Sequence, residues 1–221
     1  MIFPNLKDIQ SVRIKYPQIH YEQSAENWLF VGSIDIVDNE GNYYDSYDVE
    51  IVGTLLFPRQ FPKLYEHSNK FPKTADWHTF NDESCCTAVP GKEILATQNG
   101  ITVLRYINEF AVPYLANQTY RKRNGNYANG EYAHNKYGEI EFFEELFFTK
   151  NLLIILRCID LALSDKDLKN IKCVCTSDEK YKHCHRKSIK KARLLGKEYL
   201  NRIRVTCWQE FFLKNNPQNT I

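Results

Sequence analysis

Residues 76–90 read Asp-Trp-His-Thr-Phe-Asn-Asp-Glu-Ser-Cys-Cys-Thr-Ala-Val-Pro, a polar segment between a strand-rich region and a helical region. A thiol on a loop between rigid elements suits nucleophilic chemistry. Cys85 and Cys86 do not suit a structural disulfide, because adjacent Cα atoms across a trans peptide lie only about 3.8 Å apart. The ordinary alternative is that both are buried, since free cysteine is among the most buried residue types.

The composition is that of a globular protein, with 221 residues, 43% hydrophobic and 25% charged. This length allows one good core and an appendage. A formal net charge of +2 argues neither for nor against nucleic acid, which we do not expect as a partner. The first residues lack the pattern of a signal peptide. Seven cysteines then indicate metal binding or catalysis before disulfides, and we expect a cytoplasmic protein without a membrane partner.

The order of the expected elements predicts an α+β fold. Apolar alternation predicts two strands that pair as a hairpin, followed by a short third strand: residues 28–37, 47–55 and 64–66. Two Phe-Pro pairs at residues 57–62 end the second strand. Apolar residues at helical spacing predict helices over residues 6–16, 101–115, 139–148 and 151–163, with residues 121–136 as a loop. Strands grouped together and helices grouped together are typical of α+β proteins.

The helical pattern that begins at residue 101 has two expected features. Its Leu104, Ile107 and Phe110 face should be buried against the sheet. Pro113 lies inside the pattern and should kink the helix or end it early.

These elements and residues resemble the ubiquitin-conjugating enzyme fold, which has an N-terminal helix, a meander of antiparallel strands, a Phe-Pro segment, a His-Pro-Asn motif, a cysteine loop and closing helices. Residues 57–62 resemble the proline-rich segment, residues 76–78 the His motif and residues 84–87 the cysteine loop. The closer likeness is to divergent bacterial members with an Asp-Trp-His…Cys signature, some of them encoded beside cyclic-oligonucleotide synthases in antiphage operons. The resemblance implies a conjugating domain over residues 1–150 and a helical extension over residues 151–221.

The resemblance also implies an activity. It is that of a transferase whose cysteine forms a thioester with the C-terminus of a ubiquitin-like protein or a related protein tail. An activating enzyme or a cyclic-oligonucleotide synthase would be a further partner, in antiviral defence. Cys86 is favoured as the nucleophile with Cys85 as its packed neighbour, and His78 would fix the loop geometry. Asn81, one place later than the family's Asn, or backbone N–H groups of the loop would hold the oxyanion.

A second site is expected within residues 171–186. The spacing C-x-C-x₈-C-H brings together the three thiolates and one imidazole of a common tetrahedral zinc set: Cys173, Cys175, Cys184 and His185. This spacing resembles the SEC-C zinc motif at the C-terminus of the bacterial secretion ATPase. Thr176 and Asp178 replace glycines that usually open the turn of that motif. The resemblance implies a structural zinc ion.

Alternatives remain at three places. A rival to the transferase is a catalytically inactive binding module of the same fold, which holds a protein or nucleic-acid partner through its zinc element and basic tail. The basic run after residue 179 could bind an acidic partner or nucleic acid, and it is favoured as a solvated helix face, with Ile189, Leu194, Leu195 and Leu200 turned inward. His134 is a second histidine in a polar loop, favoured as a solvated residue over a catalytic base.

Overall fold

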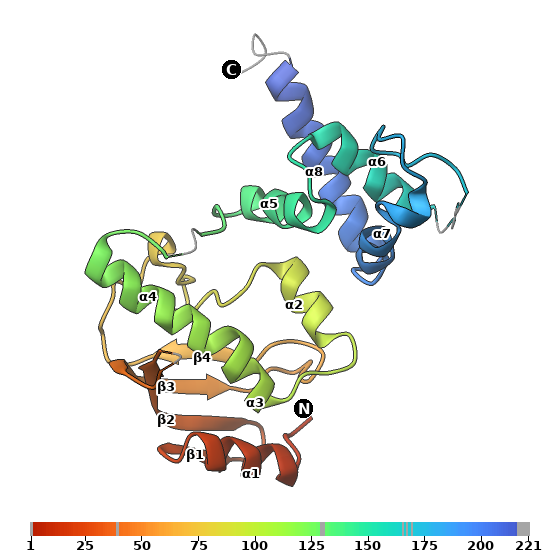
Figure 1. Ribbon diagram of the computed structural model, residues 1–221. Coiled ribbons are helices and arrows are strands. Elements are labelled where there is room, and N and C mark those ends of the chain that lie inside the picture. Colours follow the sequence, from red (N-terminus) through yellow and green to blue (C-terminus); the bar gives the residue numbers. More distant parts are fainter. Residues whose placement is uncertain are drawn as a thin grey trace. The chain divides into compact units, whose positions relative to one another are not determined.

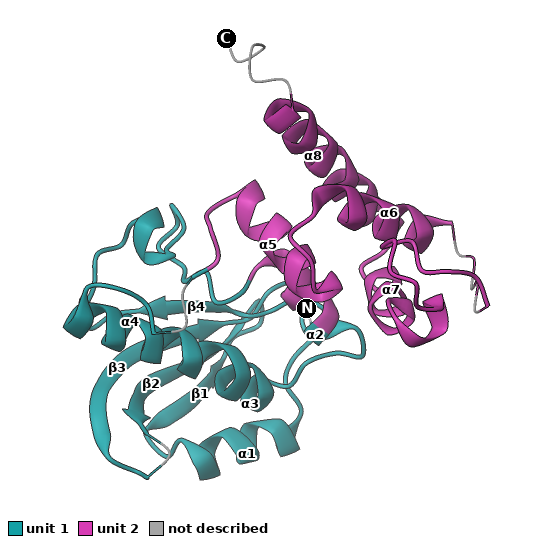
Figure 2. Ribbon diagram, turned by 45° about the horizontal axis from the view of Figure 1, so that its top comes forward, with its two compact units in different colours: residues 1–88, 96–131 teal, residues 89–95, 132–221 magenta. Residues whose placement is uncertain are grey.

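The computed structural model describes residues 2–38, 40–128, 131–164, 166, 168 and 170–215. It confirms the α+β class, and it divides into two compact units (Figure 2). The sheet unit comprises residues 1–88 and 96–131, and the helical unit comprises residues 89–95 and 132–221. This division differs from the boundary expected at residue 150, because helix α5 (Lys136–Phe147) buries Phe143 and Phe147 in the core of the helical unit.

The sheet unit contains an antiparallel meander (Figure 1). Over the described residues its four strands follow chain order: β1 (Ile19–Gln23), β2 (Trp28–Val37), β3 (Tyr43–Val52) and β4 (Lys63–Glu66). The hairpin predicted from the sequence is confirmed as the β2–β3 pair. So is its apolar face, since Tyr47, Val49 and Ile51 are all buried. Strand β1 was not predicted.

In Figure 1 the helices α3 (Val103–Tyr106) and α4 (Val112–Asn124) lie over this sheet, and α1 (Leu6–Lys15) lies beside β1. A π turn, η2 (Ile107–Ala111), joins α3 to α4, and a short 3₁₀ turn, η1 (Ala75–Trp77), follows the sheet. Buried Asp8 of α1 accepts hydrogen bonds from the backbone N–H groups of Val103 at 2.7 Å and Leu104 at 3.2 Å. A carboxylate at a helix N-terminus satisfies otherwise unpaired donors, so Asp8 ties α1 to the start of α3.

Pro113 does not end the helical run, which continues to Asn124. The π turn precedes it, and the N–H of Val112 donates to the carbonyl of Ile107, five residues back. A proline inside an α-helix lacks an N–H and clashes with the carbonyl four residues earlier. The wider turn accommodates that defect, as π-bulges do.

The buried face of this run is also shifted from the expected one. Ile107 is fully buried, as predicted, but Leu104 and Phe110 are only partly buried. Val103, Tyr106 and Leu115 take the deep positions. The expectation for Leu104 and Phe110 was therefore wrong, because the buried face follows ordinary helical spacing through Val103, Tyr106, Ile107 and Ala111 and leaves Leu104 and Phe110 at its margins.

The helical unit packs its helices around a second apolar core. They are α2 (Pro90–Thr97), whose last two residues group with the sheet unit, α5, α6 (Leu152–Leu163), η3 (Tyr181–His183), α7 (Arg186–Arg193) and α8 (Lys197–Asn215). Ile189, Leu195 and Leu200 are buried as predicted, whereas Leu194 is 52% exposed. Among the described helices, none combines the length and apolar character needed to cross a membrane.

Candidate functional site

The adjacent cysteines lie on a small hairpin at the edge of the sheet. The N–H of Cys86 donates to the carbonyl of His78 at 2.7 Å, and the N–H of Phe80 donates to Ser84 at 2.8 Å. On the other side, the N–H of Cys85 donates to the carbonyl of Leu64 in β4 at 2.8 Å. The cysteine segment is therefore held between β4 and residues 78–80 by backbone hydrogen bonds.

The two thiols have different surroundings. Cys85 is 6% exposed and belongs to the apolar core, and burial raises the pKa of its thiol to about 12. Cys86 is half-buried, with its Sγ 3.8 Å from the carbonyl of Ala88. Successive side chains of an extended segment point to opposite faces, so burial of one thiol turns the other outward. Cys86 is thus the more accessible of the pair.

His78 is fixed through both its backbone and its ring. Its backbone is left-handed, with φ of 50°. Helix α4 holds this turn, because the Tyr114 hydroxyl donates to the carbonyls of Trp77 at 3.1 Å and His78 at 3.2 Å. The His78 ring places Nε2 2.8 Å from a carboxylate oxygen of Glu131. The hairpin register places the backbone of His78 opposite that of Cys86.

Asn81 is not brought beside Cys86. It is exposed in the turn that joins residues 78–80 to 84–86, where the N–H of Glu83 donates to the carbonyl of Phe80. Cys86 lies at the open end of the hairpin, opposite His78. Three strand residues span about 10 Å, which separates the Asn81 backbone from the thiol. His134, the alternative base, belongs to the helical unit.

Glu131 is the residue of this site that the sequence did not single out. It lies 53 positions after His78, in the polar segment expected to be a loop. No local pattern links a carboxylate to a histidine at that separation. The available signal was weak: an acidic residue in a segment that also holds histidine.

The second site is built on a short backbone bridge. Lys172 and Lys180 form an antiparallel bridge, and the N–H of Cys173 donates to the carbonyl of Glu179 at 2.9 Å. The loop between them carries Cys175. Residues 181–183 then form η3, and His185 is the N-cap residue of α7. Local hydrogen bonds therefore fold residues 171–185 into a knuckle that carries all four predicted ligands.

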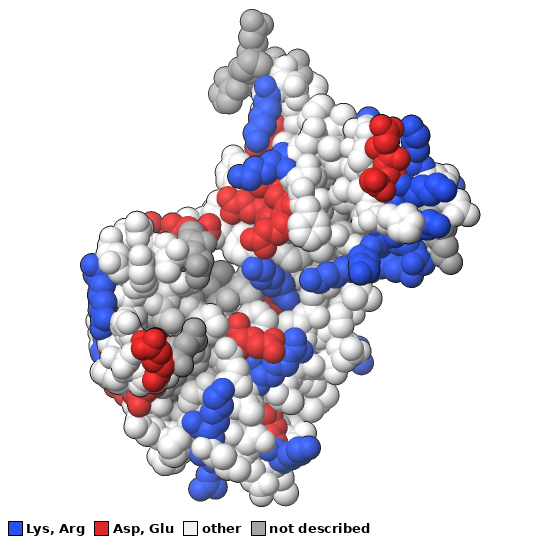
Figure 3. Space-filling model, viewed as in Figure 1, with Lys and Arg blue, Asp and Glu red and all other residues white. Residues whose placement is uncertain are grey.

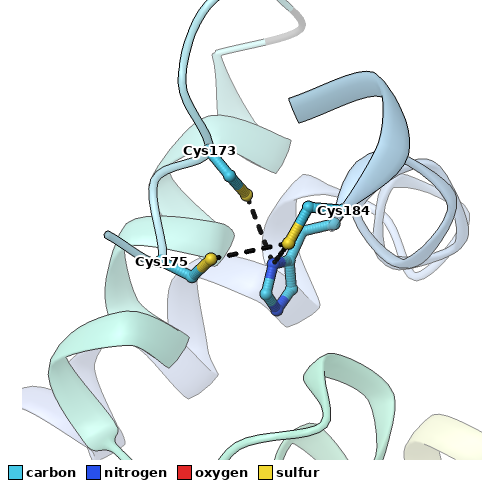
Figure 4. A group of neighbouring side chains, drawn as sticks. Cys173, Cys175 and Cys184 are labelled. Carbon is cyan, nitrogen blue, oxygen red and sulfur yellow. Dashed lines mark hydrogen bonds between the residues drawn. The ribbon is translucent and has the colours of Figure 1, made fainter. Parts of the chain in front are cut away.

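The structure brings those four side chains together. In Figure 4 the labelled cysteines surround one imidazole, and the ligand atoms of Cys173, Cys175, Cys184 and His185 lie within 4.8 Å of one another. His185 Nδ1 is 3.0 Å from the sulfur of Cys184 and 3.3 Å from that of Cys173, and the sulfurs of Cys175 and Cys184 are 3.5 Å apart. Two thiolates on a tetrahedral zinc ion lie about 3.8 Å apart, given Zn–S bonds of about 2.3 Å. The cluster could bind a metal ion and is compatible with zinc.

The electrostatics of the cluster favour a cation. Burial opposes ionisation of Cys175, but hydrogen bonding with Ser177 at 3.2 Å outweighs it and lowers the pKa of this thiol to about 6. Burial, together with the neighbouring sulfurs, raises the pKa of Cys184 to about 12. A bound metal ion would overcome the resistance of Cys184 to ionisation, because coordinating thiols lose their protons.

Comparisons of the chain with models of protein families, with curated proteins and with solved structures gave no match. The geometry of the two sites is therefore what supports a function.

Proposed function

We propose that the protein is an acyl transferase resembling ubiquitin-conjugating enzymes, with Cys86 as its nucleophile. The order of helix, antiparallel meander, cysteine hairpin and helices supports this proposal. The observation that carries it is the hairpin itself. The hairpin buries Cys85, leaves Cys86 accessible and pairs its backbone with that of His78.

The proposed reaction begins with proton removal from the Cys86 thiol, because the thiolate is the nucleophile. His78 would accept that proton. Glu131 accepts a hydrogen bond from Nε2 of His78, so Nδ1 is the ring nitrogen that would take the proton. The thiolate attacks the carbonyl carbon of a C-terminal thioester, a thioester forms on Cys86, and the original thiol leaves. An amine then attacks this thioester and releases Cys86.

Backbone N–H groups of the loop would stabilise the oxyanion of the tetrahedral intermediate. Asn81, the donor expected from the resemblance, is placed in the turn at the far end of the hairpin. Its substitution by Ala should therefore leave the rate of thioester formation within twofold of the wild-type rate. Such an outcome would separate this site from one that depends on an Asn side chain.

The test uses a peptide ending in Gly-Gly as a C-terminal thioester, with intact-mass spectrometry as the readout. We expect an adduct that an excess of a small thiol removes by thioester exchange and that a non-thiol reducing agent leaves in place. Cys86→Ala should abolish it, and Cys85→Ala is the matched control that should keep it. His78→Asn and Glu131→Gln should slow the adduct and move its rate profile to higher pH, because the thiol loses its base.

A second candidate, an inactive binding module of the same fold, is favoured by the position of Asn81. That reading becomes the better one if neither cysteine forms the adduct while the peptide still binds. An adduct lost in Cys85→Ala and kept in Cys86→Ala would instead show that the nucleophile was assigned one residue too late.

We also propose that the metal held by Cys173, Cys175, Cys184 and His185 is a structural zinc ion. Four protein ligands close the coordination sphere, as structural zinc sites require, and leave no position for a substrate. The residues that follow the knuckle support a structural role, since His185 both belongs to the ligand cluster and begins α7.

A further inference from the structure

The positive charge of this protein is concentrated around the metal knuckle. The whole chain carries 29 Lys and Arg against 27 Asp and Glu. Residues 171–197 alone hold nine of the former and two of the latter, Asp178 and Glu179. The rest of the chain therefore has more acidic than basic residues. The net charge of +2 is the sum of this acidic remainder and a strongly basic segment.

Helix α7 separates its residues into two faces. Ser188, Ile189 and Ala192 are buried, whereas Lys187, Lys190 and Lys191 are exposed. Positions three and four apart lie about 5–6 Å from each other on a helix surface, so the three lysines form one cluster. Lys180 and Lys182 of the knuckle are exposed as well. Figure 3 shows Lys and Arg gathered over α7, and we call the exposed lysines of residues 180–191 the lysine face.

The lysine face is not neutralised within the described structure. Across the residues that the structure describes, no carboxylate pairs with Lys187, Lys190 or Lys191. Lysines elsewhere do have such partners, for example Lys122 with Asp45 and Lys136 with Glu210. Like charges at this helical spacing destabilise a helix. The lysine face therefore has a cost in the folded protein that a bound anion would offset.

The residue types indicate which anion. Lysine is depleted from the cores of protein–protein interfaces, which use aromatic anchors and arginine. Within residues 171–197 the one Phe, Tyr or Trp side chain is that of Tyr181, which is fully buried, so the lysine face offers no large aromatic anchor. Protein–nucleic acid interfaces are polar and strongly positive, and lysines contact phosphates as point charges.

We infer that the lysine face binds the phosphate backbone of double-stranded nucleic acid without reading its sequence. This inference replaces the expectation from the sequence that nucleic acid is not a partner. That expectation rested on the interpretation of the basic run after residue 179 as a solvated helix face. The inference is independent of the proposed transferase activity, because it concerns residues of the helical unit alone.

The test is a fluorescence-anisotropy titration of a short labelled DNA duplex with the full chain, repeated over a salt series. Sequence-independent binding should be micromolar or weaker, and its affinity should fall steeply between about 50 and 200 mM salt. The variant Lys187→Gln/Lys190→Gln/Lys191→Gln should weaken binding to duplexes of different sequence equally. It should also reduce the slope of log affinity against log salt by about three, one for each lost phosphate contact.

A charge-matched control is available on α1, where Lys7, Arg13 and Lys15 are exposed. The variant Lys7→Gln/Arg13→Gln/Lys15→Gln should keep the wild-type affinity and slope. Both variants change exposed residues, and circular dichroism melts check that they fold. The inference is overturned if the duplex does not bind at the lowest salt, or if both triple variants weaken it equally. It is also overturned if poly-glutamate binds the lysine face and the duplex does not, or if a single strand binds more tightly than the duplex.

Discussion

The imidazole of His185 places Nε2 2.8 Å from the backbone carbonyl oxygen of Phe147, the last residue of α5. A carbonyl oxygen only accepts, so Nε2 carries the proton and Nδ1 keeps its lone pair. Nδ1 is the atom that faces the sulfurs of Cys173 and Cys184. Metal-binding histidines characteristically donate their second N–H in this way. The contact also ties the metal knuckle to a helix that begins 49 residues before His185.

The first prediction is that the purified protein contains about one equivalent of zinc by elemental analysis. Cys184→Ser should lose the metal and lower the unfolding temperature, because metal binding contributes folding energy directly. Cys207→Ala is the matched control: Cys207 is buried outside the cluster, so its loss should cost stability and keep the metal. Metal-free wild-type protein whose unfolding temperature does not change in Cys184→Ser would rule the site out.

The second prediction concerns strain in the knuckle. Thr176 has φ of 65°, a left-handed conformation that is costly for a β-branched residue and free of that cost for glycine. Thr176→Gly should raise the free energy of unfolding of the metal-loaded protein by about 1 kcal/mol. Denaturant titration of the wild-type and variant proteins measures this difference in the free energy of unfolding.

Asp178→Gly provides the control for that substitution. Asp178 stands where the resembling motif has another glycine, yet it is not among the residues with positive φ. Glycine there gains nothing in the folded state and adds freedom to the unfolded chain, so stability should fall by about 0.5–1 kcal/mol. Equal effects of the two substitutions would show that backbone conformation is not the cause.

The third prediction is that mild alkylation labels Cys86 before Cys85. Burial raises the pKa of Cys85 to about 12, so below that pH this thiol stays protonated in the folded protein and reacts slowly. Raising the pH should increase labelling of Cys86 first. Peptide mapping after a timed reaction with iodoacetamide distinguishes the two. Faster labelling of Cys85, or labelling of neither in the native protein, would contradict the placement of the pair.

The fourth prediction concerns the helical run over the sheet. Ile107 is fully buried in the core, and Ile107→Ala should cost about 2–5 kcal/mol, as large-to-small core substitutions do. Leu104 is only partly buried, so Leu104→Ala should cost clearly less, because less surface returns to water. Thermal or denaturant unfolding of the two variants gives the comparison. A larger loss in Leu104→Ala would contradict this placement of the buried face.

Local patterns in the sequence determined the elements that depend on near neighbours. Alternation of Tyr47, Val49 and Ile51 predicted a strand and its buried face, which the structure confirms. The C-x-C-x₈-C-H spacing predicted the four-residue cluster, because a short loop needs only local backbone bonds to bring such ligands together. Periodicity and spacing act over a few residues, and both can be read along the chain.

The tertiary structure alone decided features that depend on contacts between distant residues. Strand β1 has one buried residue, Ile19, and no clear alternation, so its pairing with β2 creates it. The partner of His78 is Glu131, and the carbonyl that orients His185 comes from Phe147. Side-chain burial and hydrogen-bond partners follow from packing across the fold. A local sequence pattern contains no information on which distant residues pack together. For the same physical reason the lysines share one face, without a carboxylate partner among the described residues, only because α7 buries its apolar side.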